Sequence, residues 1–211
     1  CYENEAWFEA FPPSLAVILY YIQWLAELLP ILKTVVKMQA GGKYPSNEDG
    51  RVYFFFPKMG YPSGNFHEII TKYVNALLNT KGGVLVFGVD PVSCKILGCH
   101  VNRAQEDLFR LEFDKEVRNM RPTVSPSLCR FILTKLENSP LCVLEVKISA
   151  APIGEMYMNS SEQVYVIRQR KLFGPLRPQE IKDLVIAKYR EVVFALIIKF
   201  INKYKLIHLL L

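Results

Sequence analysis

The sequence lacks the patterns that mark several common protein classes. Its five cysteines form no Cys-x-x-Cys pair and no regular framework, which is typical of reduced thiols inside a cell and argues against a disulfide-bonded secreted domain. There is no Gly-x-x-x-x-Gly-Lys-Ser/Thr motif, so a P-loop that cradles nucleotide phosphates is excluded. No internal repeat or low-complexity tract is present. These absences favour an ordinary globular protein, intracellular and expected in the cytoplasm.

Two long apolar segments occur near the ends, and neither is a clean membrane span. Residues 14–32 contain a glutamine, a glutamate and a proline, and they lack the basic leader and cleavage site of a secretory signal. Residues 192–211 contain three lysines, and a lysine near the centre of a spanning helix costs about 3 kcal/mol. We interpret both segments as buried or interfacial helices. A membrane anchor formed by residues 192–211 stays open as an alternative.

The composition is that of a folded, mildly basic chain. Hydrophobic residues make up 51% of the 211 residues and charged residues 22%, which is globular composition. The formal net charge is +6 and the pI is about 9.0. This balance suits a nucleic-acid or membrane-surface partner, but it does not say where the positive side chains gather.

Hydrophobic periodicity predicts an α/β fold with a mixed (α+β) sheet in a single domain. The expected parts are an apolar, helical N-terminal segment (1–39), a linker (40–50), the α/β domain (51–190) and an apolar C-terminal helix or anchor (191–211). Within the domain, strands are expected at residues 51–56, 84–89, 96–98, 128–136, 141–148 and 163–168. Helices are expected at residues 66–78, capped by Ser63 or Asn65, at residues 102–120, and from Pro178 to about Arg190.

The most distinctive segment is Tyr73 to Asp90, YVNALLNTKGGVLVFGVD. It predicts a helix ending at Asn79-Thr80, a double glycine and a strand buried on both faces. Asp90 follows that strand, at the end where α/β folds commonly place ligands. An aspartate that simply opens a turn is an equal interpretation.

This segment resembles the signature of the Schlafen family, in its AlbA-type core domain. The matching elements are Asn79-Thr80, Gly82-Gly83 and Gly88-Val89-Asp90, supported by the later VYVIRQRKLFGPL of residues 164–176, which is similar to short Schlafen-like proteins. The resemblance implies a Schlafen-type core domain with flanking apolar helices. It also implies metal-dependent endonucleolytic cleavage of structured RNA, such as tRNA and rRNA, in the members that are active.

In the family, that cleavage depends on three acidic residues. The resemblance implies that two of these three positions carry other residue types in this sequence. Glu48 stands at the first glutamate position, Tyr53 at the second, and Pro91 at the aspartate position, next to Asp90. Hard Mg²⁺ or Mn²⁺ is held by carboxylates, and one carboxylate organises such an ion poorly. Glu48 and Asp90 are therefore interpreted as remnants of a degenerate site. No metal or other cofactor is expected unless the chain is an active nuclease.

Two other patterns have ordinary explanations that we favour. Asp90 with Glu145-x-Lys147 imitates a metal-nuclease motif, but the alternation around Glu145 is that of a strand. Cys99-His100, with Cys129 and Cys142 further on, could supply a zinc site. Cysteines that pack as small buried hydrophobic residues explain the same pattern.

Basic residues gather near the end of the domain. Guanidinium groups suit phosphate oxygens, and an exposed aromatic ring can stack on an unpaired base. A solvated hairpin tip is an equal interpretation. The candidate RNA-binding residues are Arg168, Arg170, Lys171, Phe173 and Arg177.

The sequence thus favours a Schlafen-like pseudoenzyme over a working enzyme. The hypothesis is that it binds structured, tRNA-like RNA or supports an active protein partner, such as another Schlafen-type chain. An active metal-dependent endoribonuclease and a membrane-anchored interaction protein stay open as alternatives.

Overall fold

The computed structural model describes residues 38–45, 50–59, 65–152 and 154–210. They belong to one compact unit, Met38–Leu211. The candidate Glu48 and nearly all of the apolar N-terminal segment (1–39) lie outside the described residues.

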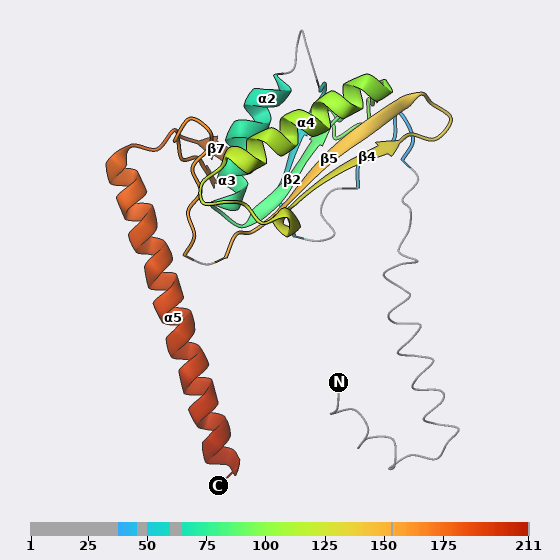
Figure 1. The fold of residues 1–211 in the computed structure, drawn as a ribbon. Coiled ribbons are helices and arrows are strands. Elements are labelled where there is room, and N and C mark those ends of the chain that lie inside the picture. The colour runs from blue at the N-terminus through green and yellow to red at the C-terminus, as the bar shows by residue number, and fades with distance from the viewer. Residues whose placement is uncertain (1–37, 46–49, 60–64, 153, 211) are drawn as a thin grey trace, which may run out of the picture. The chain divides into compact units, whose positions relative to one another are not determined.

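A five-stranded mixed sheet forms the centre of the domain (Figure 1). Its strands are β1 (Tyr53–Phe56), β2 (Gly82–Phe87), β3 (Cys99–His100), β4 (Cys129–Lys135) and β5 (Leu141–Ser149). β1 is parallel to β2, and β5 is antiparallel to β2, β3 and β4. The β4–β5 hairpin and the mixed α/β class were both predicted, and both are confirmed.

Two helical segments pack on one face of this sheet (Figure 1). The first is a continuous helical stretch made of α2 (Phe66–Ile69), the π-helical turn η2 (Ile70–Val74) and α3 (Asn75–Leu78). The second is α4 (Arg103–Asn119), and a short 3₁₀ turn, η3 (Pro126–Leu128), precedes β4. Asn65 caps α2 by accepting a hydrogen bond from the Glu68 N–H at 3.2 Å, as predicted. Asn102 begins α4 with a capping box.

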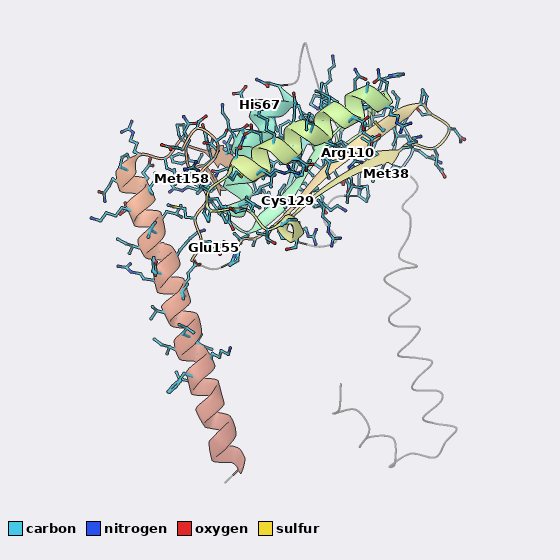
Figure 2. The ribbon with its side chains drawn as sticks, viewed as in Figure 1. Met38, His67, Arg110, Cys129, Glu155 and Met158 are labelled. Carbon is cyan, nitrogen blue, oxygen red and sulfur yellow. The ribbon has the colours of Figure 1, made fainter. Side chains whose placement is uncertain are left out.

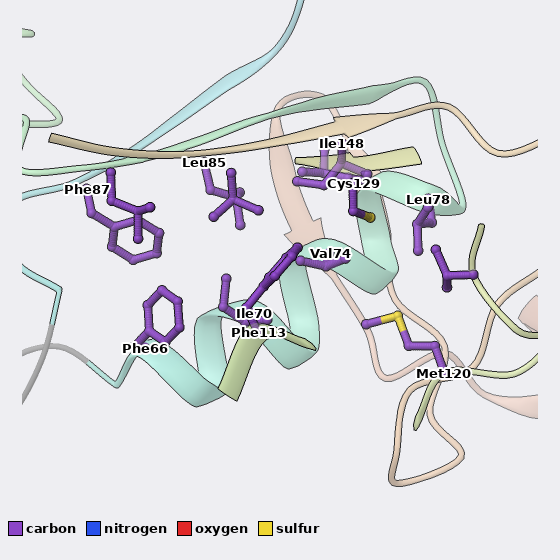
Figure 3. Close-up of a cluster of buried hydrophobic side chains, with 14 of the residues drawn as sticks. Phe66, Ile70, Val74, Leu78, Leu85, Phe87, Phe113, Met120, Cys129 and Ile148 are labelled. Atoms are coloured by element: carbon purple, nitrogen blue, oxygen red, sulfur yellow. The ribbon is translucent and has the colours of Figure 1, made fainter. Parts of the chain in front are cut away.

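The main core lies between those helices and the sheet (Figure 3). Because successive strand residues face opposite sides, Leu85 and Phe87 of β2 point toward the helices while Val84 and Val86 point away. All six residues of β2 are buried. This confirms the predicted strand that is buried on both faces.

Among the described residues, non-helical segments pack on the other face of the sheet. Residues 38–45 run beside the turn that follows β2, where the Gly41 N–H donates to Ile96 O and the Tyr44 N–H to Cys94 O, both at 2.8 Å. Together these segments enclose a second apolar cluster that includes Tyr44, Val89 and Ile96. The strand expected at residues 96–98 is reduced to a bridge between Val89 and Ile96.

A hairpin and a long helix complete the unit. The hairpin joins β6 (Val166–Arg168) to β7 (Lys171–Phe173), and the helix α5 spans Pro178–Leu210. Ile181 and Leu184 of α5 pack on a small cluster formed by Val164, Val166 and Leu176. The helix begins at Pro178 as predicted but continues beyond Arg190, because neither glycine nor proline follows to end it.

Large apolar side chains of α5, such as Phe194 and Leu196, are exposed. Even so, no helix among the described residues combines the length and the apolar character needed to cross a membrane.

Candidate functional site

Asp90 lies in the turn after β2, and its carboxylate holds that turn. Its Oδ2 accepts hydrogen bonds from the Ser93 hydroxyl at 2.6 Å and from the Ser93 N–H at 2.7 Å. These hydrogen bonds lower the pKa of Asp90 below its usual value, and the bond from the Ser93 hydroxyl has the larger effect. Pro91 follows it and is exposed. This is the geometry of a turn-opening aspartate.

Tyr53 lies on the sheet face that residues 38–45 cover. It is half-buried at the start of β1, level with Val84 of β2. Its ring stacks on Phe55 with centroids 6.2 Å apart and meets Tyr44 edge-on at 6.0 Å. Tyr53, which the resemblance aligns with a glutamate, therefore packs in an aromatic cluster.

A buried carboxylate lies on this same face. Glu145 of β5 is 5% exposed, and its Oε1 accepts a 2.6 Å hydrogen bond from the Tyr44 hydroxyl. Its Oε2 lies 2.9 Å from Lys147 Nζ, since residues two apart on a strand share a face. The Glu145-x-Lys147 pair is thus an internal ion pair in a regular strand. Among the described residues, no three His, Cys, Asp or Glu side chains gather closely enough to hold a metal ion.

The three cysteines considered as zinc ligands, Cys99, Cys129 and Cys142, are buried in the sheet. Burial raises the pKa of Cys99 to about 11 and that of Cys129 to about 12. Cys142 of β5 is paired with Cys99 of the neighbouring strand β3, and its Sγ donates to the Cys99 carbonyl oxygen at 3.2 Å. Zinc binds thiolates, and these surroundings favour the neutral thiol. The geometry fits cysteines that act as small hydrophobic residues (Cys129 is labelled in Figure 2).

We expect stability to fall at high pH partly because of Cys129. Its pKa is about 12 in the folded chain against an ordinary 9.0, so the folded state holds the proton more tightly. The stabilisation is complete below about pH 9 and is lost as the pH rises toward 12, with a slope of at most about 1.4 kcal/mol per pH unit.

Urea unfolding from pH 8.5 to 10.5 measures this slope. The Cys129→Ala variant is expected to lose stability less steeply with pH than the wild-type chain. Val166→Ala, which removes a buried side chain that does not titrate, serves as control and is expected to keep the wild-type slope. Identical slopes for all three chains would contradict the role given to Cys129.

Asn79, the asparagine of the family signature at the end of α3, forms buried hydrogen bonds to a distant segment. Asn79 is 2% exposed, and its Oδ1 accepts from the Tyr157 N–H at 2.7 Å. Its Nδ2 donates to the Tyr157 carbonyl at 2.8 Å and to the Tyr165 carbonyl at 3.2 Å. Asn75, one turn earlier, accepts from the Tyr165 N–H at 2.8 Å. These two amides attach the segment before β6 to α3, which the sequence did not indicate.

The predicted basic residues come together on the β6–β7 hairpin. Arg168 pairs with Lys171 across the two strands, and Arg170 lies in the turn between them. The Arg168 guanidinium carbon lies 4.6 Å from the centre of the Phe173 ring, a cation–π contact. Phe173 is 43% exposed. We call Arg168, Arg170, Lys171 and Phe173 the basic hairpin; all four side chains are exposed.

Arg177 lies outside this hairpin, in the residues that lead into α5. It is exposed, and its backbone N–H donates to the Glu180 carboxylate at 2.8 Å. Two lysines that the sequence did not indicate, Lys81 and Lys188, lie close to the turn of the hairpin. Both line the same cleft as Arg170 of that turn. Only the folding of distant segments brings them there.

Comparison with known proteins gives a family and a solved structure. The sequence model of the family described as "Schlafen, AlbA_2" matches residues 57–174. The crystal structure of the DIP2311 protein from Corynebacterium diphtheriae aligns with a TM-score of 0.45 at 15% sequence identity. That alignment covers 72% of this chain and 27% of that protein.

Proposed function

Because this chain belongs to the Schlafen AlbA_2 family, whose model covers more than half of its residues, we propose that it binds structured RNA through the basic hairpin. The family supports a function related to nucleic acids. The hairpin supports RNA in particular, and it is the observation that carries the proposal.

The hairpin offers the two kinds of contact that an exposed nucleotide needs. Arg168, Arg170 and Lys171 can bind phosphate oxygens, and a guanidinium does so with paired donors. One face of the Phe173 ring holds the Arg168 guanidinium, so the ring is already oriented, and its 43% exposure leaves surface for a base. The sheet pairing of the hairpin fixes these groups before RNA arrives, which lowers the entropy lost on binding.

We further propose that the chain does not cleave RNA. The residues at the family's metal-binding positions do not fit Mg²⁺ or Mn²⁺, because Tyr53 and Pro91 offer no carboxylate. The Asp90 carboxylate accepts hydrogen bonds from Ser93 of its own turn, and Lys147 and Tyr44 hold Glu145. A chain of this kind can still support an active partner by holding the shared RNA.

The test is binding of a purified tRNA to the purified chain, measured over a range of salt. We expect the double variant Arg170→Gln/Lys171→Gln to bind about tenfold more weakly than wild type. The slope of log affinity against log salt should also fall by about 2, since each lost phosphate contact removes roughly one released counterion.

The matched control removes the same charges from another surface. Lys115→Gln/Arg118→Gln on α4 also replaces one lysine and one arginine at exposed positions, and we expect an affinity within about twofold of wild type. Equal losses in both variants would mean non-specific attraction to net charge and would contradict the hairpin.

Cleavage is tested in the same preparation with Mn²⁺. Cutting of the tRNA that disappears in Glu48→Ala would overturn the proposal that the site is degenerate and would establish the endoribonuclease alternative. Intact tRNA in both chains is the expected result.

A further inference from the structure

A cleft of about 390 Å³ lies between the basic hairpin and the first turns of α5. Its walls are formed mainly by the turn from Asn79 to Gly82, the hairpin turn at Gln169 and Arg170, and one face of α5. Val52, Ile167, Leu184 and Ala187 supply the apolar part of its lining. Asn79, Thr80 and Gly82 of the family signature therefore border this cleft, although the Asn79 side chain forms internal hydrogen bonds.

The charged lining of the cleft is mostly positive. Lys81, Arg170 and Lys188 line it, with Glu191 as the one carboxylate among its lining residues. Within the described part of the chain, none of the three cations forms an ion pair with a carboxylate. Three unpaired cations around one small cleft repel one another, and an anion bound among them removes that repulsion.

Lys188 adds a second reason to expect an anion. It is half-buried, and its ammonium donates a hydrogen bond to the backbone carbonyl of Glu155 (Glu155 is labelled in Figure 2). An ammonium has three donors, and this is its one hydrogen bond to the described residues. Burial lowers the pKa of Lys188, and the nearby carboxylates of Glu191 and Glu155 act in the opposite direction. A bound anion would stabilise the charged form of this lysine.

The position of the cleft indicates which anion. Arg170 belongs both to the cleft and to the basic hairpin, so a strand whose base stacks on Phe173 passes next to the opening. A phosphodiester group is the anion that such a strand carries at every nucleotide. Lysine binds phosphate as a point charge and arginine with paired donors, and the cleft offers both.

We propose that this cleft is a phosphate-binding subsite that extends the RNA surface from the hairpin to α5, with Lys81 and Lys188 as its ligands. The inference rests on the proposed function, because it assigns a second contact to the same RNA. The proposal also gives the first turns of α5 a role in binding, because the helix supplies one wall of the cleft and the half-buried Lys188.

Paired substitutions of opposite sign test the subsite, with the same tRNA as probe. We expect Lys81→Gln to weaken binding about fivefold and to lower the salt slope by about 1. Glu191→Gln removes the negative charge from the lining and is expected to strengthen binding by roughly twofold to threefold. A gain of affinity cannot come from a damaged fold, so this variant keeps the test sharp.

The matched control is Lys182→Gln. Lys182 is exposed on α5 and outside the lining of the cleft, so we expect less than about a twofold change in affinity. Lys188→Met, which keeps the apolar stem without the charge, is expected to behave like Lys81→Gln while a thermal melt shows the chain folded.

The outcomes separate the subsite from the proposed function. If Lys81→Gln and Glu191→Gln both match Lys182→Gln while the hairpin variant still loses affinity, the subsite is overturned and RNA binding by the hairpin stands. If the hairpin variant also binds like wild type, the proposed function fails as well. A third outcome is that inorganic phosphate raises the thermal stability of the wild-type chain while Lys81→Gln leaves tRNA binding unchanged. The cleft would then be a site for free phosphate, and the RNA subsite would be overturned.

Discussion

Asn79→Ala is expected to lower the free energy of unfolding by about 3 kcal/mol, which is roughly a hundredfold loss in the ratio of folded to unfolded chain. The substitution leaves the buried Tyr157 N–H without its acceptor and takes donors from the Tyr157 and Tyr165 carbonyls. A buried donor left unsatisfied costs about 1–3 kcal/mol by itself, and the lost hydrogen bonds add to that. Urea unfolding, read as a shift of the midpoint at unchanged slope, measures the loss.

Asn119→Ala is the matched control for this prediction. Asn119 ends α4, is exposed and has no side-chain hydrogen bond to the described residues. The same change there should alter stability by less than about 0.5 kcal/mol. An Asn79→Ala chain as stable as Asn119→Ala would show that water satisfies the Tyr157 N–H and that the amide is dispensable.

Gly82→Ala is expected to cost about 4 kcal/mol, from two independent causes. Gly82 has a φ of +73°, in the left-handed region that a side chain makes unfavourable by about 1–2 kcal/mol. A Cβ at this position would also lie 2.6 Å from the Ile148 carbonyl oxygen and 2.7 Å from the Ala150 nitrogen. Those atoms are backbone of β5 and its extension, and β5 is paired on both sides, so they cannot move away cheaply.

Gly50→Ala separates the two causes. Its φ of +69° is nearly the same, but a Cβ there would meet nothing within 4 Å. We expect it to lose about 1 kcal/mol, the backbone cost alone. The difference between the two variants, measured by urea unfolding, is then the cost of crowding against β5. Equal losses would show that the sheet absorbs the added methyl group.

Asn79 and Gly82, two residues of the family signature, have structural roles. Asn79 holds the segment before β6, and Gly82 allows β2 to approach β5 closely. Both residues therefore act on the fold, so we expect the signature to persist in a chain that has Tyr53 and Pro91 at two of the three acidic positions implied by the resemblance. The binding chemistry that we propose lies elsewhere, on the hairpin and in the cleft beside it.

Much of the fold followed from local patterns along the chain. The continuous apolar run before Gly88 predicted a buried strand, the 3.6-residue period before Asn79 predicted a helix, and Pro178 marked the start of α5. Each of these depends on neighbours within a few residues, so sequence alone is informative. The sequence also determined that Tyr53 and Pro91 cannot supply carboxylates, because that depends only on residue type.

Contacts between distant segments were decided by tertiary structure alone. No local pattern says that Tyr44 will donate to Glu145, or that Asn79 will bind the backbone at Tyr157. The cleft likewise exists because α5 packs beside a turn and a hairpin from other parts of the chain. Such contacts depend on how the sheet and helices pack, and the free energy of that packing is spread over the whole core. Residue types thus set which chemistry is possible, and packing decided which side chains meet to perform it.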